Sequence, residues 1–216
     1  MNETLKATKL DFCLVKPYFK GFKISFIMAL VLVIMNKSLT FGVIFTTIIS
    51  TMFIAQPFSI SESNGMDKMY GILPISKKHL VMGRYLYTCL IGLLVSLLST
   101  LIYSILLRVL GVTVSLPEIG MAALFGFAIF SFYTIFQLPG FYKYGTLKGK
   151  SFIYIPMIVY GILIYVLIQF DGLSGLVFTF ITENTIVVGI AALLICIAAY
   201  GVSITASIRA LQNKEM

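Results

Sequence analysis

Charged residues are scarce in this sequence of 216 residues: Asp, Glu, Lys and Arg together make up 11% of it. Soluble globular domains carry about 25% charged residues. Apolar residues account for 59% of the chain, and the mean hydropathy is +1.02. A soluble fold of this size cannot cover so much apolar surface with polar groups. The composition therefore excludes soluble enzymes, soluble nucleic-acid binders and disordered proteins, and it predicts an integral membrane protein.

Residues that carry catalytic or metal chemistry are also few. His79 is the single histidine, so neither a multi-histidine metal site nor a Ser-His-Asp triad can be assembled. The cysteines, Cys13, Cys89 and Cys196, are far apart and odd in number, which gives no basis for a disulfide framework. No carboxylate falls within the cores of the apolar segments, and this argues against transport coupled to ions through a membrane-embedded acid.

One segment comes close to a nucleotide-binding motif. Residues 145–151, Gly-Thr-Leu-Lys-Gly-Lys-Ser, resemble the P-loop pattern G-x-x-x-x-G-K-[ST] but are one residue short. A P-loop also follows a β-strand of a soluble sheet, whereas this segment joins two apolar segments. We interpret it as a basic, glycine-containing turn, and we expect the chain to bind no cofactor and to hydrolyse no ATP by itself.

The apolar residues form segments long enough to cross a bilayer, which takes about 20 helical residues. Six spans are predicted, at about residues 17–36, 39–58, 84–108, 118–138, 152–170 and 185–208. Pro17 suits the first turn of the first span, and Pro139-Gly140 predicts the end of the fourth. Residues 1–16 mix lysine with apolar residues, which predicts a helix lying in the lipid headgroups and not a cleavable signal peptide. The expected fold is a single all-α transmembrane domain.

The distribution of positive charge predicts the orientation. With both termini in the cytoplasm, all Lys and Arg residues except Lys37 and Arg108 lie on the cytoplasmic side. Membrane proteins retain positive charge on that side of the bilayer. The same partition explains the net charge of +8 without a nucleic-acid partner.

Small and hydroxyl-bearing residues recur every four residues in the third and sixth predicted spans. These residues are Gly92, Ser96, Thr100 and Ser104 in the third span and Ala199, Ser203 and Ser207 in the sixth. They permit close contact and hydrogen bonds between helices, and packing within the chain is the favoured interpretation. The alternative is a substrate path or a subunit seam. The candidates for that alternative are Thr46, Ser50, Ser96, Thr100 and Tyr103.

The longest predicted cytoplasmic loop, residues 59–83, contains a short amphipathic segment. Met66, Met69 and Tyr70 fall at positions i, i+3 and i+4 and would form one apolar face of a helix that ends before Pro74. Ser76 is placed to cap the next helix. A helix of this kind suits the docking of a soluble partner, and a helix resting in the membrane interface is the alternative.

The same loop carries a resemblance to a known family. Glu62, residues 73–77 (Leu-Pro-Ile-Ser-Lys), Val81 and residues 84–86 (Arg-Tyr-Leu) resemble the "E … LPxSR … V … KYL" signature of ABC-2 type permeases. These are the membrane subunits of bacterial ATP-driven exporters. The predicted spans, the N-terminal helix and the position of the loop also match, although Lys replaces the common Arg of the LPxSR motif and Arg replaces the common Lys of KYL. The chain is most similar to Gram-positive permeases that export amphipathic peptide toxins, such as phenol-soluble modulins, or confer resistance to antimicrobial peptides.

The resemblance implies a permease of the bacterial cytoplasmic membrane that pairs with separate cytoplasmic ABC ATPase subunits and with a second permease, identical or paralogous. It also implies that the ATPase subunits bind ATP and Mg. The coupling residues that it implies are Glu62, Gly65, Met66, Asp67, Lys68, Met69, Tyr70, Gly71, Leu73 and Pro74. The external re-entrant gate that it implies contains Leu173, Leu176, Phe178 and Phe180.

Two other functions stay open from the sequence. A substrate-binding membrane receptor of an energy-coupled importer is also small and lacks an ATPase motif, and its isolated chain would bind a vitamin tightly. A non-transporting membrane scaffold or sensor would show no ligand-dependent nucleotide hydrolysis.

Overall fold

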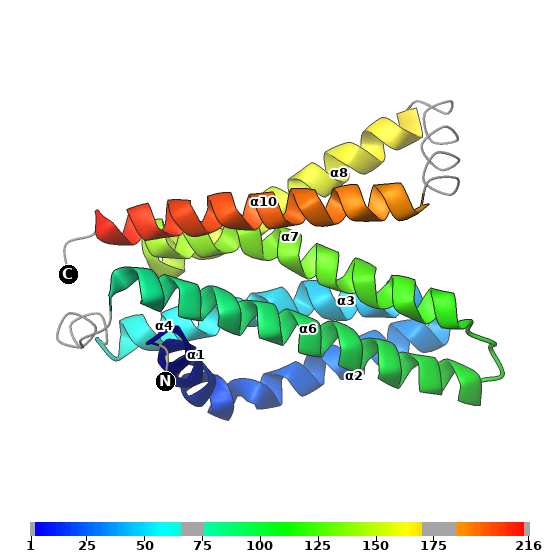
Figure 1. Ribbon diagram of the computed structural model, residues 1–216. Coiled ribbons are helices and arrows are strands. Elements are labelled where there is room, and N and C mark those ends of the chain that lie inside the picture. Colours follow the sequence, from blue (N-terminus) through cyan, green and yellow to red (C-terminus); the bar gives the residue numbers. More distant parts are fainter. Residues whose placement is uncertain (1–2, 66–75, 170–184, 214–216) are drawn as a thin grey trace.

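The computed structural model describes residues 3–65, 76–169 and 185–213, and these ranges are helical throughout apart from short turns (Figure 1). In chain order the elements are α1 Glu3–Val15, η1 Lys16–Phe19, α2 Lys20–Asn36, α3 Leu39–Thr51, η2 Met52–Ala55, α4 Gln56–Ser63, α6 Lys77–Val109, α7 Leu116–Gly149, η3 Lys150–Ile153, α8 Tyr154–Gln169 and α10 Thr185–Gln212. The prediction of an all-α fold is therefore confirmed.

Among the described residues, four helical stretches are long and apolar enough to cross a membrane. They are Leu39–Ser63, Lys77–Val109, Leu116–Ile162 and Leu194–Gln212. A fifth results if Glu3–Phe19 and Lys23–Asn36, which meet at 62°, are counted as one broken span. The stretch Leu116–Ile162 takes in the predicted span 118–138 and part of 152–170, and Figure 1 shows α8 running back from the end of α7. The prediction of membrane-spanning helices is confirmed, and the number of six spans stays a prediction.

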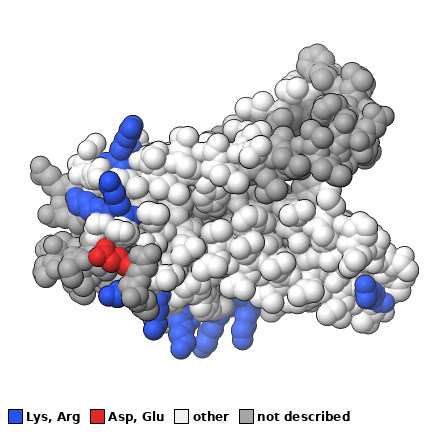
Figure 2. Space-filling model, viewed as in Figure 1, with Lys and Arg blue, Asp and Glu red and all other residues white. Residues whose placement is uncertain are grey.

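Both chain termini lie at the same end of the bundle, together with α1, α4 and the start of α6 (Figure 1). On the face drawn in Figure 2, most Lys and Arg side chains gather at this end and along the adjoining edge, and the rest of the described surface is largely free of them. We call it the charged end. A largely uncharged surface beside a charged end is typical of a protein that crosses a bilayer.

The element boundaries differ from the predictions at two places near the charged end. Pro17 lies in the 3₁₀ turn η1, and α2 begins at Lys20. The loop predicted at residues 59–83 is shorter, because α4 continues to Ser63 and α6 already begins at Lys77. The predicted cap of α6 is confirmed, since the His79 backbone N–H donates to Ser76 Oγ at 3.4 Å.

The predicted helix end at Pro139-Gly140 is wrong. Pro139 lies inside α7, which continues to Gly149 with a kink at Gly145. Proline lacks an N–H, so it leaves the carbonyl of Ile135, four residues earlier, without its helical donor. Ser203 of α10 supplies a replacement, because its hydroxyl donates to the Ile135 oxygen at 2.8 Å. Ser203 is also hydrogen-bonded to the Tyr85 hydroxyl at 2.6 Å. The position of the missing helical hydrogen bond therefore becomes a contact point of α6, α7 and α10.

Ser203→Ala is expected to lower the free energy of unfolding by about 1 kcal/mol, because the Ile135 carbonyl loses its donor in an apolar surrounding. In a Pro139→Ala background the cost should be smaller, since the substituted alanine provides the helical N–H that proline lacks. A double-mutant cycle read by unfolding in detergent should give a coupling energy of about 0.5–1 kcal/mol. The matched control is Ser207→Ala, which removes another partner of Tyr85 and leaves Ile135 untouched. Equal coupling of Pro139 to both serines would contradict this explanation.

Candidate functional site

The described coupling residues lie at the charged end. Glu62 is near the end of α4, and Gly65 follows that helix with a φ of 62°. The remaining predicted coupling residues, Met66, Asp67, Lys68, Met69, Tyr70, Gly71, Leu73 and Pro74, lie outside the described residues, as do the predicted gate residues Leu173, Leu176, Phe178 and Phe180. The site can therefore be built from the residues that flank the loop 66–75 on both sides.

Glu62 connects α4 to α7, just after the kink of α7 at Gly145. Both oxygens of its carboxylate lie 3.1 Å from the backbone nitrogen of Thr146, and the Thr146 hydroxyl also donates to it. The neighbouring Gly145 has a φ of 73°, and a Cβ at this position would lie 2.5 Å from Glu62 Oε1. A side chain at position 145 would therefore be strained and would also collide with the carboxylate. In the segment that resembles a P-loop in sequence, the Thr146 donors are therefore already occupied by the Glu62 carboxylate, whose negative charge would repel a phosphate.

Arg84 connects α6 to α1 and α4. Its Nε lies 3.4 Å from Asp11 Oδ2, and its Nη2 donates to Ser61 Oγ at 3.1 Å. The side chains of Arg84 and Asp11 are 5% and 4% exposed, and the guanidinium stacks 4.2 Å from the centroid of the Phe58 ring. Burial raises the pKa of the Asp11 carboxyl, and the charge of Arg84 offsets part of that rise. We call Asp11, Ser61, Glu62, Arg84 and Thr146 the charged-end cluster.

The helix α1 packs against α6 at a close backbone contact. The Thr8 hydroxyl donates to the carbonyl of Gly83 at 3.0 Å, and a Cβ on Gly83 would lie 2.6 Å from Ala7 Cβ and 2.9 Å from the Thr4 carbonyl oxygen. The predicted N-terminal helix is present, but one of its faces is buried in the protein. That face contains Ala7, Thr8, Asp11 and Val15. The helix is therefore part of the bundle as well as a candidate for headgroup contact.

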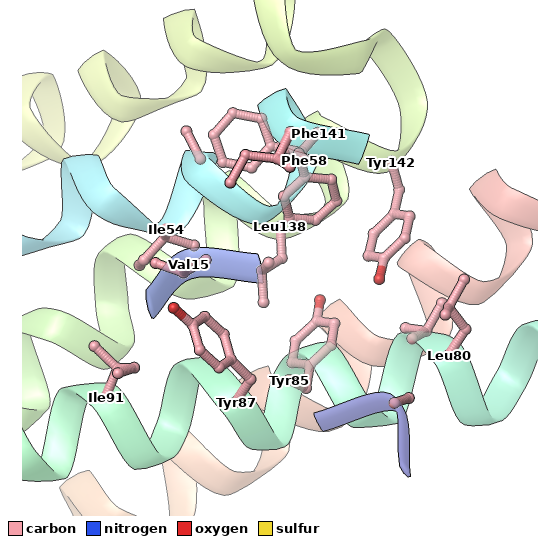
Figure 3. Close-up of a cluster of buried hydrophobic side chains, with 14 of the residues drawn as sticks. Val15, Ile54, Phe58, Leu80, Tyr85, Tyr87, Ile91, Leu138, Phe141 and Tyr142 are labelled. Carbon is pink, nitrogen blue, oxygen red and sulfur yellow. The ribbon is translucent and has the colours of Figure 1, made fainter. Parts of the chain in front are cut away.

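Aromatic side chains fill the space beneath the charged-end cluster. Figure 3 shows Phe58 and Phe141 on one side of Leu138 and Tyr85 and Tyr87 on the other. The ring centroids of Phe58 and Phe141 are 5.0 Å apart. This packing joins α4, α6 and α7 into one unit directly beside the ends of the loop 66–75.

The candidates for a substrate path or subunit seam are all buried in the single chain. They are Thr46, Ser50, Ser96, Thr100 and Tyr103, each 0–2% exposed. The Tyr103 hydroxyl is 2.7 Å from Thr46 Oγ1 and donates to the Phe26 carbonyl at 3.2 Å, so this tyrosine ties α6 to α3 and α2. These contacts are packing within the chain, and a role in a path or seam stays a prediction.

The charged residues of the family signature have structural partners that the sequence analysis missed. From the sequence alone, Asp11, the partner of Arg84, is not singled out within residues 1–16, and Thr146, the partner of Glu62, is placed only in a turn. One signal for Asp11 was available, because positions 7, 8, 11 and 15 share one face of a helix and the other three residues there carry no charge.

Comparison with known families agrees with the resemblance. Residues 8–212 match the family described as ABC-2 family transporter protein. The chain belongs to this family. No curated protein and no solved structure matches it. This ABC-2 protein is therefore a multi-pass membrane permease subunit of an ABC transporter, and Glu62 and Arg84 of its signature act as ties between helices at the charged end.

Proposed function

We propose that this permease exports an amphipathic or hydrophobic peptide, of the peptide-toxin or antimicrobial-peptide type, and that separate ABC ATPase subunits drive it. In this proposal the chain crosses the cytoplasmic membrane six times, has its charged end in the cytoplasm and pairs with a second permease. ATP and Mg are bound by the ATPase subunits. Residues 66–74 dock on those subunits, and Leu173, Leu176, Phe178 and Phe180 close the outer mouth.

The observation that carries the proposal is the set of ties around the loop 66–75. Glu62, four residues before Met66, is bound to α7 just after its kink at Gly145, and Arg84, which follows the loop, is bound to α1 and α4. A force applied to the loop would therefore reach α1, α6 and α7 through charged and hydrogen-bonded contacts and move them as a body. A receptor or scaffold has no need for such a connection between a cytoplasmic loop and its spans.

Transport in inside-out membrane vesicles tests the export direction. Vesicles that contain the permease with its ATPase should accumulate a fluorescent amphipathic helical peptide when ATP is added outside. Vesicles that accumulate it equally without ATP, or only release it when ATP is added, would contradict export.

Met69→Asp should reduce this ATP-dependent uptake at least about tenfold, because a charge in an apolar docking contact costs several kcal/mol and each 1.4 kcal/mol is a factor of ten. The variant should still insert at the normal level, because position 69 lies outside the spans. Met69→Leu, which keeps the apolar volume, is the control and should retain uptake. Full uptake by Met69→Asp would remove the coupling role from this segment.

A further inference from the structure

A cavity of about 430 Å³ lies between the end of α3, η2 and α4 on one side and α7, η3 and the first residue of α8 on the other. We call it the Gln137 cavity. None of the residues of the charged-end cluster lines this cavity, and the family match assigns it no role. Its volume is large enough for a polar headgroup and exceeds what one or two water molecules fill.

Gln137 is the buried polar residue in the wall of this cavity. Gln137 is 1% exposed, yet its Oε1 has no hydrogen-bond partner among the residues that the structure describes. The neighbouring hydroxyl of Thr134 is directed to the Phe130 carbonyl at 2.7 Å and does not supply a donor. A buried acceptor without a donor costs free energy, so the cavity favours a ligand that brings a hydroxyl or amine hydrogen.

The charged side chain in the wall of the cavity is positive. Lys150 lies in its wall, and no carboxylate does. Within the described parts of the chain, Lys150 also has no ion-pair partner. The hydroxyls of Ser59 and Ser151 add polar groups beside this lysine. An anionic group therefore suits this side of the cavity, and a phosphate is well matched to an ammonium with hydroxyls around it.

Two exposed side chains that line the cavity are largely apolar. Met52 is 59% exposed and Tyr154 is 60% exposed, and both line the cavity. Exposed apolar side chains on a bundle that crosses a membrane contact acyl chains. A ligand with an anionic phosphate, a hydrogen-bond donor and hydrocarbon tails matches Lys150, Gln137 and the apolar side chains at once. A soluble phosphate ester leaves Met52 and Tyr154 without contact.

We propose that the Gln137 cavity is a binding site for an anionic phospholipid with a hydroxyl-bearing headgroup. The phosphate lies at Lys150, a headgroup hydroxyl donates to Gln137 Oε1, and the acyl chains leave past Met52 and Tyr154. Such a lipid joins α4 to η3 and α8. The inference does not depend on which molecule the permease exports or in which direction.

The test measures phosphatidylglycerol binding to the purified full-length chain in detergent by native mass spectrometry. We expect phosphatidylglycerol to bind at least about tenfold more tightly than phosphatidylcholine, because the zwitterionic headgroup has no hydroxyl donor and carries an added cation. Lys150→Ala should remove this preference. Gln137→Met, of similar shape without the acceptor, should weaken phosphatidylglycerol binding about three- to tenfold. Lys148→Ala, an exposed lysine outside the cavity, is the matched control and should change nothing.

Folding of the variants is checked by their melting temperature without added lipid, which Gln137→Met should not lower, because it removes an unpaired buried acceptor. Equal binding of the two lipids, or a preference that survives both Lys150→Ala and Gln137→Met, would overturn the proposal. Binding of glycerol 3-phosphate, a soluble phosphate ester, distinguishes a soluble ligand from a lipid. If it binds alone as tightly as phosphatidylglycerol, the site takes a soluble ester and the lipid assignment is wrong.

Discussion

Replacing Asp11 by leucine is expected to lower the free energy of unfolding by about 3–5 kcal/mol, the usual cost of removing one partner of a buried ion pair. The guanidinium of Arg84 stays charged at any accessible pH. It would keep its hydrogen bond to Ser61 and its place over the Phe58 ring, but no carboxylate would balance it. Unfolding in mild detergent, followed by circular dichroism, measures the change.

Arg84→Met should be less damaging than Asp11→Leu, and its cost should depend on pH. Without Arg84, only burial acts on the Asp11 carboxyl, and its pKa rises further above the ordinary value. A carboxyl whose pKa is higher in the folded state takes up a proton on folding, so its penalty disappears as the pH falls. The deficit of Arg84→Met relative to wild type should therefore shrink as the pH falls through this raised pKa, whereas that of Asp11→Leu, which has no carboxyl to protonate, should not shrink.

The double variant Asp11→Leu/Arg84→Met is the control for this interpretation. Replacing both members of a buried ion pair by apolar residues is often neutral or stabilising. We expect the double variant to be more stable than either single one. Losses that simply add would mean that Asp11 and Arg84 act independently, which would contradict the ion pair as the tie between α1 and α6.

Gly83→Ala should destabilise the protein by about 1–3 kcal/mol, the usual range for inserting atoms into a packed contact. The added methyl group would lie 2.6 Å from Ala7 Cβ and 2.9 Å from the backbone oxygen of Thr4, so α1 has to move away from α6. That movement would also pull Asp11 from Arg84. Trypsin should then cleave faster after the lysines of α1, and limited proteolysis measures this directly.

Gly201→Ala provides the matched comparison for Gly83→Ala. Gly201 is in the interior of α10, and a Cβ there meets nothing within 4 Å. The same substitution should therefore leave stability unchanged or raise it by up to about 1 kcal/mol through helix propensity. If both alanines have the same effect, the close contact between α1 and α6 is not what fixes the N-terminal helix.

Much of the helical framework is predictable from sequence because its signals are local. Apolar length predicts the helices that cross the membrane, and Ser76 marks the start of α6 as a side-chain cap. The end assigned at Pro139 fails for a reason outside the local sequence. The hydroxyl that replaces its missing helical donor belongs to Ser203, 68 residues from Ile135.

In the candidate site, too, the local sequence identifies some residues but not their distant partners. The signature singles out Glu62 and Arg84 within one segment of the chain, but their partners lie elsewhere. Asp11 is 73 residues from Arg84, and Thr146 is 84 residues from Glu62. Only the packing of α1 against α6 and of α7 against α4 brings these groups together. A charged residue in a family signature therefore points to an interaction without naming the partner.

Affinity purification from native membranes tests whether a separate ATPase drives this permease through residues 66–74. In mild detergent with nucleotide present, an ATP-binding subunit should co-purify in equal amount with the wild-type chain and with Met69→Leu. It should be lost from Met69→Asp. Recovery of the wild-type chain alone, with no ATP-binding subunit under these conditions, would contradict the account and favour a receptor or scaffold.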